Sequence, residues 1–342
     1  MNDDVLKQFD DLTVVSGDID LPHTFTLTGI VHNEMHFLPA FLPHYRGLGV
    51  DRFIFIDDQS DDGTRDYLAA QADVVVLHSG WRFGDSVSTD GDGRSDLMGT
   101  KIMTIWRNLL LRKFCIDVWS LHLDADEFLD LPEGMTLQDL AAQLGTNAER
   151  AVWSVMLDMY PATARELLSM RGDAMVDFDQ KWFFDGKCHL RLRKHKGPSV
   201  KYGGVRARLM QAHGVNTKAN WFDRRIAARI GLPPKRYNNI RKPAFLRWAE
   251  GEWLSSPHSV GLQASTKYLL PLRHYKFNGA IAQRIQWAIE TGSYASGSSE
   301  YVALEKLLTQ MQQQDESFLC RNSVLYTGFE DFRRSGNAVG FD

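Results

Sequence analysis

The fold of this chain is decided by residues 121–129, which read Leu-His-Leu-Asp-Ala-Asp-Glu-Phe-Leu. The residues at 118–123 are mostly β-branched, aromatic or aliphatic, so they predict a buried strand. Three acids, Asp124, Asp126 and Glu127, come directly after it. Because an unpaired buried charge is costly, we expect these acids at the carboxyl end of the strand, where open α/β sheets bind their ligands.

The spacing of Asp124 and Asp126 suits a divalent cation. Side chains two positions apart point the same way in an extended backbone. Two hard oxygen ligands on one side favour Mg²⁺ or Mn²⁺, above all where a diphosphate completes the shell. A bare Asp-x-Asp is more often a strand followed by an acidic turn, but a second acidic strand end strengthens the functional interpretation.

That second acidic strand end follows residues 52–56, an apolar run typical of a parallel sheet buried on both faces. Residues 57–64 then read Asp-Asp-Gln-Ser-Asp-Asp-Gly-Thr. An EF-hand loop starting at Asp58 would have Ala69 where the bidentate Glu is required, which argues against a calcium hand. Two interpretations remain. Asp58 could hold the edge of a base or a ribose hydroxyl, or these acids could only cap a helix that starts at Thr64 or Asp62.

Strands alternate with helices along most of the chain, which predicts βαβ units and a parallel sheet. We expect an α/β fold with a mixed, mostly parallel sheet flanked by helices and a carboxyl-terminal helical region. Apolar runs predict strands at 25–31, 52–56, 74–77, 118–123 and 152–157. Helical spacing predicts helices at 38–47, from about 64, at 100–114 and at 137–144. Later signals are weaker: one or two strands in 182–193, a loop at 203–204, and helix over 281–314 with a break near 292–299.

Composition excludes several classes of protein. The net charge of −4 over 342 residues argues against a nucleic-acid partner, and the basic clusters at 187–208 and 224–247 suit either a phosphate-bearing partner or a solvated face. Cys115, Cys188 and Cys320 have no metal-site or disulfide spacing. No apolar stretch reaches the length of a membrane span, and the acidic residues 1–20 do not read as a signal peptide. We therefore expect a cytoplasmic protein, with a functional or disordered loop at 80–99.

Taken in order, three segments resemble the amino-terminal half of family 2-like glycosyltransferases, in the bacterial branch that carries Asp-x-Asp-Glu-Phe. They are 30–34 (Ile-Val-His-Asn-Glu), 53–64 and 121–129, and softer matches follow at 157–161, 203–206 and 272–277. The resemblance implies a GT-A fold, a nucleotide-sugar donor, with UDP expected, and Mn²⁺ or Mg²⁺. It divides the chain into a tail at 1–20, a GT-A domain at 21–280 with nucleotide-binding (21–135) and acceptor (136–280) halves, and a helical extension at 281–342.

The resemblance also implies roles for single residues. Asp126 would ligate the metal, and His274 matches a late histidine that often supplies a second ligand. Taken alone, His274 reads as an ordinary half-buried polar residue, and Lys101 and Asn108 as surface positions. The donor-sugar pocket stays unassigned, because 80–99 fits the family pattern poorly. The residues implied to bind the nucleotide are Asn33, Glu34, Asp58, Lys101, Asn108 and Asp124.

Glycosyl transfer gives these residues chemical reasons. The leaving diphosphate develops negative charge, which a divalent cation offsets, and an inverting reaction needs a base for the acceptor hydroxyl. We name Asp185 as that base, because it follows the aromatic residues 182–184, which could stack on a sugar; an ordinary hydrophobic strand end is the alternative. The other candidates are Asp158, Asp179, Glu250, Glu252 and His258.

The leading hypothesis is a metal-dependent, hexosyltransferase-type enzyme of bacterial surface-polysaccharide biosynthesis, acting on a glycan or lipid-linked acceptor, with a peripheral membrane contact allowed. The alternatives are a non-catalytic nucleotide- or glycan-binding module and a sugar nucleotidyltransferase. The intact acids at 124–127 argue against the first, and the lack of a Gly-rich phosphate loop near the amino terminus argues against the second. Two geometric expectations follow: Asp58 and Asp126 lie at strand ends that face one cleft, and the His274 ring approaches Asp126.

Overall fold

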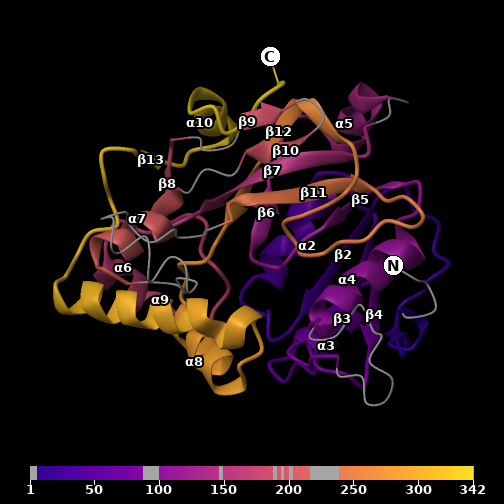
Figure 1. Cartoon of the computed structure of the whole chain (residues 1–342), viewed down its shortest axis with the longest axis horizontal. Helices are drawn as coiled ribbons and strands as arrows, with labels where there is room; N and C mark the ends of the chain where they lie inside the picture. Colours follow the sequence, from indigo (N-terminus) through magenta and orange to yellow (C-terminus); the bar gives the residue numbers. More distant parts are fainter. Residues whose placement is uncertain are drawn as a thin grey trace, which may run out of the picture.

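The computed structural model describes residues 6–87, 100–145, 149–187, 191–193, 196–199, 203–215 and 239–341. Within these residues the central feature is a nine-stranded sheet with the order β1-β4-β3-β2-β5-β11-β7-β12-β6. Figure 1 shows the sheet running through the molecule, with helices packed on its faces. The chain is therefore a mixed α/β protein with a Rossmann-like sheet.

Four neighbouring strands in the first half of the sheet are parallel. β2 (Thr26–Val31) lies between β3 (Arg52–Asp57) and β5 (Trp119–His122), and β4 (Val74–His78) pairs with β3 in the same direction. The connections are the helices α2 (Leu38–Gly47), α3 (Thr64–Ala69) and α4 (Ile102–Phe114). The predicted strands and helices of this half are confirmed.

The second half of the sheet is mixed. β11 (Arg241–Arg247) is antiparallel to both β5 and β7 (Ala151–Asp158), and β12 (Ala264–His274) is parallel to β7. The short β6 (Glu127–Leu129) pairs antiparallel with β12. Among the described strands of this sheet, β2, β3, β4, β5, β7 and β12 share one direction. The prediction of a mixed, mostly parallel sheet is therefore confirmed.

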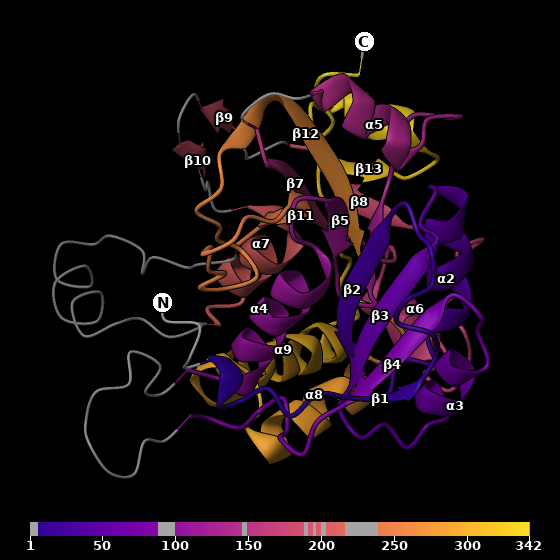
Figure 2. The ribbon, with the colours of Figure 1, turned by 90° about the vertical axis from the view of Figure 1, so that its right-hand side faces the viewer.

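The remaining elements cover the edges and one end of the sheet. The helix α9 (Ala295–Gln313) packs against α8 (Ile281–Thr291), α6 (Ala164–Ser169) and α7 (Gly204–Ala212). These helices lie together at the lower left of Figure 1, and Figure 2 shows α8 and α9 in the lower part of the molecule. β1 (Thr13–Ser16), within the stretch expected as a tail, pairs with β4. The others are α5 (Leu137–Leu144), β8 (Phe183–Asp185), β9 (Arg191–Arg193), β10 (Lys196–Ser199), β13 (Ser323–Leu325) and α10 (Phe329–Arg334).

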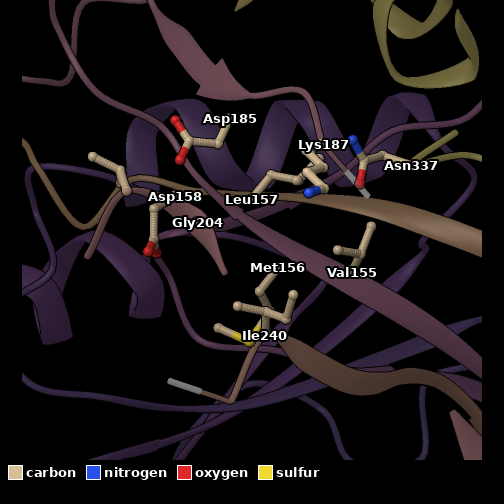
Figure 3. A pocket seen from close by; sticks show the side chains of 10 residues that line it. Val155, Met156, Leu157, Asp158, Asp185, Lys187, Gly204, Ile240 and Asn337 are labelled. Atoms are coloured by element: carbon tan, nitrogen blue, oxygen red, sulfur yellow. The ribbon is translucent and has the colours of Figure 1, made fainter. Parts of the chain in front are cut away.

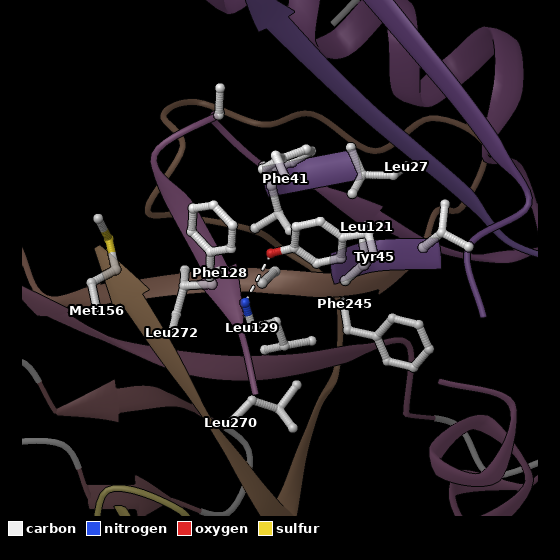
Figure 4. Packing of buried hydrophobic residues seen from close by; sticks show 14 of the residues in the cluster. Leu27, Phe41, Tyr45, Leu121, Phe128, Leu129, Met156, Phe245, Leu270 and Leu272 are labelled. Atoms are coloured by element: carbon white, nitrogen blue, oxygen red, sulfur yellow. Dashed lines mark hydrogen bonds between the residues drawn. The ribbon is translucent and has the colours of Figure 1, made fainter. Parts of the chain in front are cut away.

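Alternation along the strands builds two core layers, because successive strand residues face opposite sides. Phe53 and Phe55 join the cluster that contains α2, whereas Ile54 and Ile56 join the cluster that contains α4. In the first layer the buried Tyr45 hydroxyl donates to the Glu127 carbonyl at 2.8 Å and accepts from a backbone N–H of β6, also at 2.8 Å (Figure 4). The α2 layer thus holds the acidic segment that follows β5.

Several local predictions were wrong. The 203–204 pair does not form a loop, because α7 begins at Gly204. The cap of α3 is Gly63, with a φ of 94° that favours glycine; the Asp62 carboxylate instead accepts from the Thr64 N–H at 2.9 Å. The strand at 127–129 was not predicted. Residues 88–99 of the predicted long loop lie outside the described part of the chain.

No helix in the described ranges is long and apolar enough to cross a membrane.

Candidate active site at the carboxyl ends of the strands

Five parallel strands deliver polar side chains to one edge of the sheet. Glu34 follows β2, Asp58 follows β3, Asp126 follows β5, Asp158 ends β7 and His274 ends β12. The pairing register sets His274 of β12 beside Asp158 of β7. Because the strands share a direction, their carboxyl ends meet at the same edge. The sheet topology thus brings together residues that are up to 240 positions apart in the sequence.

Side chains of alternating charge form a continuous chain across this edge. Glu300 of α9 pairs with Arg206 of α7, whose Nε lies 2.6 Å from Asp158 Oδ2. Asp158 Oδ1 lies 2.6 Å from His274 Nδ1. The series continues through Asp126 and Arg284 to Glu34. Each buried charge in this series therefore has an opposite charge beside it, as burial of ions requires.

The His274 ring lies between two carboxylates. Its Nδ1 contacts Asp158, and its Nε2 lies 3.6 Å from Asp126 Oδ2. Burial disfavours the charged ring, but the two carboxylates raise the pKa of His274 to about 9. Burial also works against ionisation of Asp126, yet His274 and Arg284 hold its pKa well below the ordinary value. The expected approach of the His274 ring to Asp126 is met.

Lys242 and Arg107 hold the other two acids of the 124–127 segment. The Lys242 ammonium on β11 contacts Glu127 Oε2 and lies 3.3 Å from Asp124 Oδ2. Arg107 of α4 lies 2.8 Å from Asp124 Oδ1. Burial raises the pKa of Glu127, whereas Arg107 and Lys242 overcome the effect of burial at Asp124 and hold its pKa well below the ordinary value. Sequence reasoning did not find these two cations.

His122, the polar break in the apolar run before Asp124, positions Arg107. Arg107 donates to His122 Nε2 at 2.9 Å, so that nitrogen carries no proton, and His122 Nδ1 lies 2.9 Å from the Thr28 hydroxyl. Burial and Arg107 lower the pKa of His122 well below the ordinary value, which agrees with a neutral ring. His122, a polar residue inside an apolar strand, was therefore the sequence feature that pointed to a buried polar partner, which the structure shows to be Arg107 of α4.

The acids after β3 mostly build the turn from β3 into α3 and tie it to the residues that follow β2. Asp61 exchanges hydrogen bonds with the Asn33 side chain, and the Thr64 hydroxyl accepts from the Glu34 N–H at 2.8 Å. Asp58 is buried and pairs with Arg82 at 2.9 Å. Burial raises the pKa of Asp58, and Arg82 opposes that effect. Asn33 thus has a structural role, and Asp58 lies at the strand end with a partly exposed arginine over it.

Lys101 and Asn108 are placed differently from the acids. Lys101 immediately precedes α4, and its ammonium donates to the Gly84 carbonyl. Asn108 is fully buried, and its side chain donates to the Leu254 carbonyl at 3.0 Å and accepts from the Leu254 N–H at 2.8 Å. These contacts fix the segment after β11 to α4, so any nucleotide contact of these two residues stays a prediction.

Asp185 lies in a second location, at the wall of a hollow whose empty space of about 280 Å³ includes open solvent (Figure 3). Its carboxylate accepts from the Tyr160 hydroxyl at 2.6 Å and from Arg208 at 3.0 Å. Asp158 lines the same hollow and also holds His274. The hollow therefore adjoins the charged edge through Asp158. The other lining residues are Val155, Met156, Leu157, Lys187, Gly204, Val205, Ile240 and Asn337.

Asp126 and His274 are the candidate protein ligands of a divalent cation. Within the described ranges, no group of three or more His, Cys, Asp or Glu side chains is arranged to hold a metal ion. Asp126 and His274 do present two donor atoms 3.6 Å apart. Mg²⁺ is commonly held by one or two protein ligands together with substrate phosphates and water. The residues present therefore fit a cation that shares its shell with a diphosphate, and not an all-protein cage.

The fold and this edge define a mixed α/β protein with a charged site at the carboxyl ends of its strands. No family model matches the chain, and no curated protein matches it. A solved structure described as UTP-bound UGPase from Acinetobacter baumannii is 8% identical and has a TM-score of 0.30, over 83% of this chain and 99% of that one. At that TM-score the similarity has no bearing on the activity of this chain.

Proposed function

We propose that the chain is a metal-dependent glycosyltransferase that moves a sugar from a nucleotide-sugar donor, UDP-linked in the first instance, to a glycan or lipid-linked acceptor. The observation that carries the proposal is the meeting of Asp126 and His274, from opposite halves of the chain, with donor atoms 3.6 Å apart. Ligand distances of about 2.0–2.2 Å place two donors of one ion about 3 Å apart. A small side-chain movement would let one ion contact both.

The residues of the edge have distinct tasks in this proposal. Asp126 Oδ2 and His274 Nε2 would hold the ion, which when bound offsets the negative charge of a leaving diphosphate. Asp158 accepts from His274 Nδ1–H and fixes the ring plane, as carboxylate partners of metal-binding histidines do. Because the pKa of His274 is raised to about 9, Nε2 would become a ligand atom only as binding of the ion releases its proton. Asp58, at the end of β3, is the candidate partner for the base or ribose.

The acceptor half of the proposal rests on the hollow beside Asp158. Its apolar wall and its polar side chains match the mixed lining of small-molecule sites. Asp185 remains the candidate base. Oδ1 accepts hydrogen bonds from Tyr160 and Arg208, whereas Oδ2 accepts one from Arg208 only. The second lone pair of Oδ2 could therefore take the proton of an acceptor hydroxyl. Assembly of bacterial surface polysaccharide is the process in which we place this reaction.

Nucleotide binding and turnover test the proposal. Thermal unfolding of the protein should be measured with UDP, GDP or CDP, each with and without Mn²⁺. Bound nucleotide should raise the melting temperature, because a ligand at a hundred times its Kd stabilises the fold by about 2.7 kcal/mol. Turnover of UDP-glucose and related donors is then followed as released nucleoside diphosphate. We expect Asp126→Ala to abolish metal-dependent turnover and His274→Ala to weaken Mn²⁺ affinity less. Asp173→Asn, at an exposed ion pair, is the charge-matched control.

The outcomes separate the three hypotheses. Release of nucleoside diphosphate that requires Mn²⁺ and Asp126 supports a glycosyltransferase. Pyrophosphate formed from UTP and a sugar phosphate would identify a nucleotidyltransferase instead. Nucleotide or glycan binding without turnover would identify a non-catalytic module. Absence of binding by every nucleotide tested, with or without metal, would rule out the proposed function.

A further inference from the structure

Arg284 is the residue of α8 that enters the charged edge. Its Nη2 lies 2.7 Å from Glu34 Oε2 and its Nη1 lies 3.2 Å from Asp126 Oδ2. These two acids follow β2 and β5, and Arg284 follows them in the sequence by 250 and 158 residues. Its side chain is 17% exposed, so it can still be reached from solvent. One guanidinium therefore bridges two strand ends at the proposed donor site.

Helix α8 is held in a position that aims Arg284 at this edge. Ile281, Ile285 and Ala288 are buried in the cluster that joins α8 to α9. One turn beyond Arg284, Trp287 stacks on His32 with ring centroids 4.6 Å apart, and His32 contacts the Asp58 carbonyl. The helix thus contacts the residues that follow β2 and reaches the end of β3 through His32, which gives Arg284 a fixed approach to the acids.

Arg284 and a metal ion held by Asp126 and His274 would compete for the same carboxylate oxygen. Asp126 Oδ2 is the atom nearest His274 Nε2, and it is also the atom that Arg284 contacts. An ion bound between Asp126 and His274 would meet the positive guanidinium beside it, and like charges at such distances repel strongly when buried. The ion can therefore settle only when Arg284 acquires another anion in place of Asp126.

A diphosphate meets that need. Its oxygens can accept two parallel N–H bonds from a guanidinium, the geometry that makes arginine a preferred phosphate ligand. The same diphosphate would complete the shell of the ion, which the protein supplies with two donors only. Burial raises the pKa of Glu34 to about 7 even beside Arg284. The Glu34 carboxyl that contacts Arg284 is therefore less fully ionised at neutral pH than an ordinary glutamate.

We propose that Arg284 binds the diphosphate of the donor, and that Glu34 and Asp126 hold its guanidinium until the donor and the metal ion arrive together. This inference rests on the proposed function. It makes α8, from the carboxyl-terminal region, a part of the donor site. It also makes binding of the metal ion and of the diphosphate mutually dependent.

Two titrations in opposite directions test the inference. Calorimetry should measure Mn²⁺ binding without nucleotide and UDP binding with saturating Mn²⁺, in wild type, Arg284→Gln, Arg284→Lys and the exposed control Arg171→Gln. We expect Arg284→Gln to weaken UDP binding at least tenfold and to tighten Mn²⁺ binding severalfold. Arg284→Lys, which keeps the charge but loses the fork, should weaken UDP binding without tightening Mn²⁺ binding. Arg171→Gln should match wild type.

A purely structural Arg284 would give a different result, because damage to the site weakens both ligands. Weaker binding of UDP and Mn²⁺ together would overturn the inference, and so would wild-type UDP affinity in Arg284→Gln. If Arg284→Gln does not fold, Arg284→Lys decides alone, and wild-type UDP affinity in that variant overturns the inference. If wild type binds no nucleoside diphosphate, the proposed function fails and this inference fails with it. If wild type binds UDP in the presence of Mn²⁺, the results for the Arg284 variants test only the role of Arg284 and not the proposed function.

Discussion

Replacement of Lys242 by methionine should strongly destabilise the fold. The Lys242 side chain is 1% exposed, and its ammonium contacts Glu127 Oε2, on a side chain that is 2% exposed. Methionine fills a similar volume but leaves Glu127 as a buried charge whose cation has gone. Removal of one partner from a buried pair costs about 3–5 kcal/mol. We expect a loss of that size in the free energy of unfolding, measured by urea titration at neutral pH.

A second substitution and a pH series check the cause. Lys242→Met combined with Glu127→Gln removes both charges and should recover most of the loss, because an amide can still accept from the Asp124 N–H. In the single variant, burial without Lys242 raises the pKa of Glu127 further. The folded chain then binds a proton that the unfolded chain has released, so stability rises as pH falls. The deficit should therefore shrink from about pH 8 to about pH 5. A loss under about 1 kcal/mol, or no recovery in the double variant, would refute the reasoning.

Three further outcomes are expected. Asp158→Asn should lower the pKa of His274 from about 9, which an NMR titration would measure. A histidine pKa that is raised in the folded state stabilises the fold at low pH, and this stabilisation is lost as pH rises through the folded pKa. Wild type should therefore lose stability as pH rises toward about 9, and the variant should lose less. Tyr45→Phe should cost about 1–3 kcal/mol in urea, because two buried backbone groups lose their partner. Gly29→Ala should cost about 1–3 kcal/mol, because its methyl group would meet a backbone oxygen at 2.7 Å, whereas Gly47→Ala, with nothing within 4 Å, should be neutral or stabilising.

The sequence predicts the first half of the sheet well for a physical reason. Residues 52–56 and 74–77 are continuous apolar runs bounded by turn residues, so burial on both faces leaves one interpretation. The acids at 124–127 cannot continue such a strand, which places them at its end. Where patterns are short or mixed, the same reasoning fails. The three residues of β6 owe their strand to pairing with β12, and α7 starts at Gly204, the second of two consecutive glycines.

The candidate site was predictable only in its acids. Lys242, Arg107 and Arg284 complete the site, yet nothing next to them in the sequence marks them. Lys242 lies 115 residues from Glu127, and Arg284 lies 158 residues from Asp126. Such pairs are set by strand order and by helix docking, to which local periodicity is blind. The approach of His274 to Asp126 was expected from a family resemblance, because a single histidine flanked by ordinary residues carries little signal of its own.

The charges of the edge bear on how ligands must enter it. Asp58 pairs with Arg82, Asp124 with Arg107, Glu127 with Lys242, Asp126 with Arg284, and Asp158 with Arg206. A divalent cation that enters this compensated site alone adds unbalanced positive charge, and a diphosphate that enters alone adds unbalanced negative charge. Together they add almost none, and in a buried site the difference is large. A site built from closed ion pairs therefore favours binding of the metal-diphosphate complex over binding of the metal ion or the diphosphate alone. The pair between Arg284 and Asp126 is the one that must open to admit the complex.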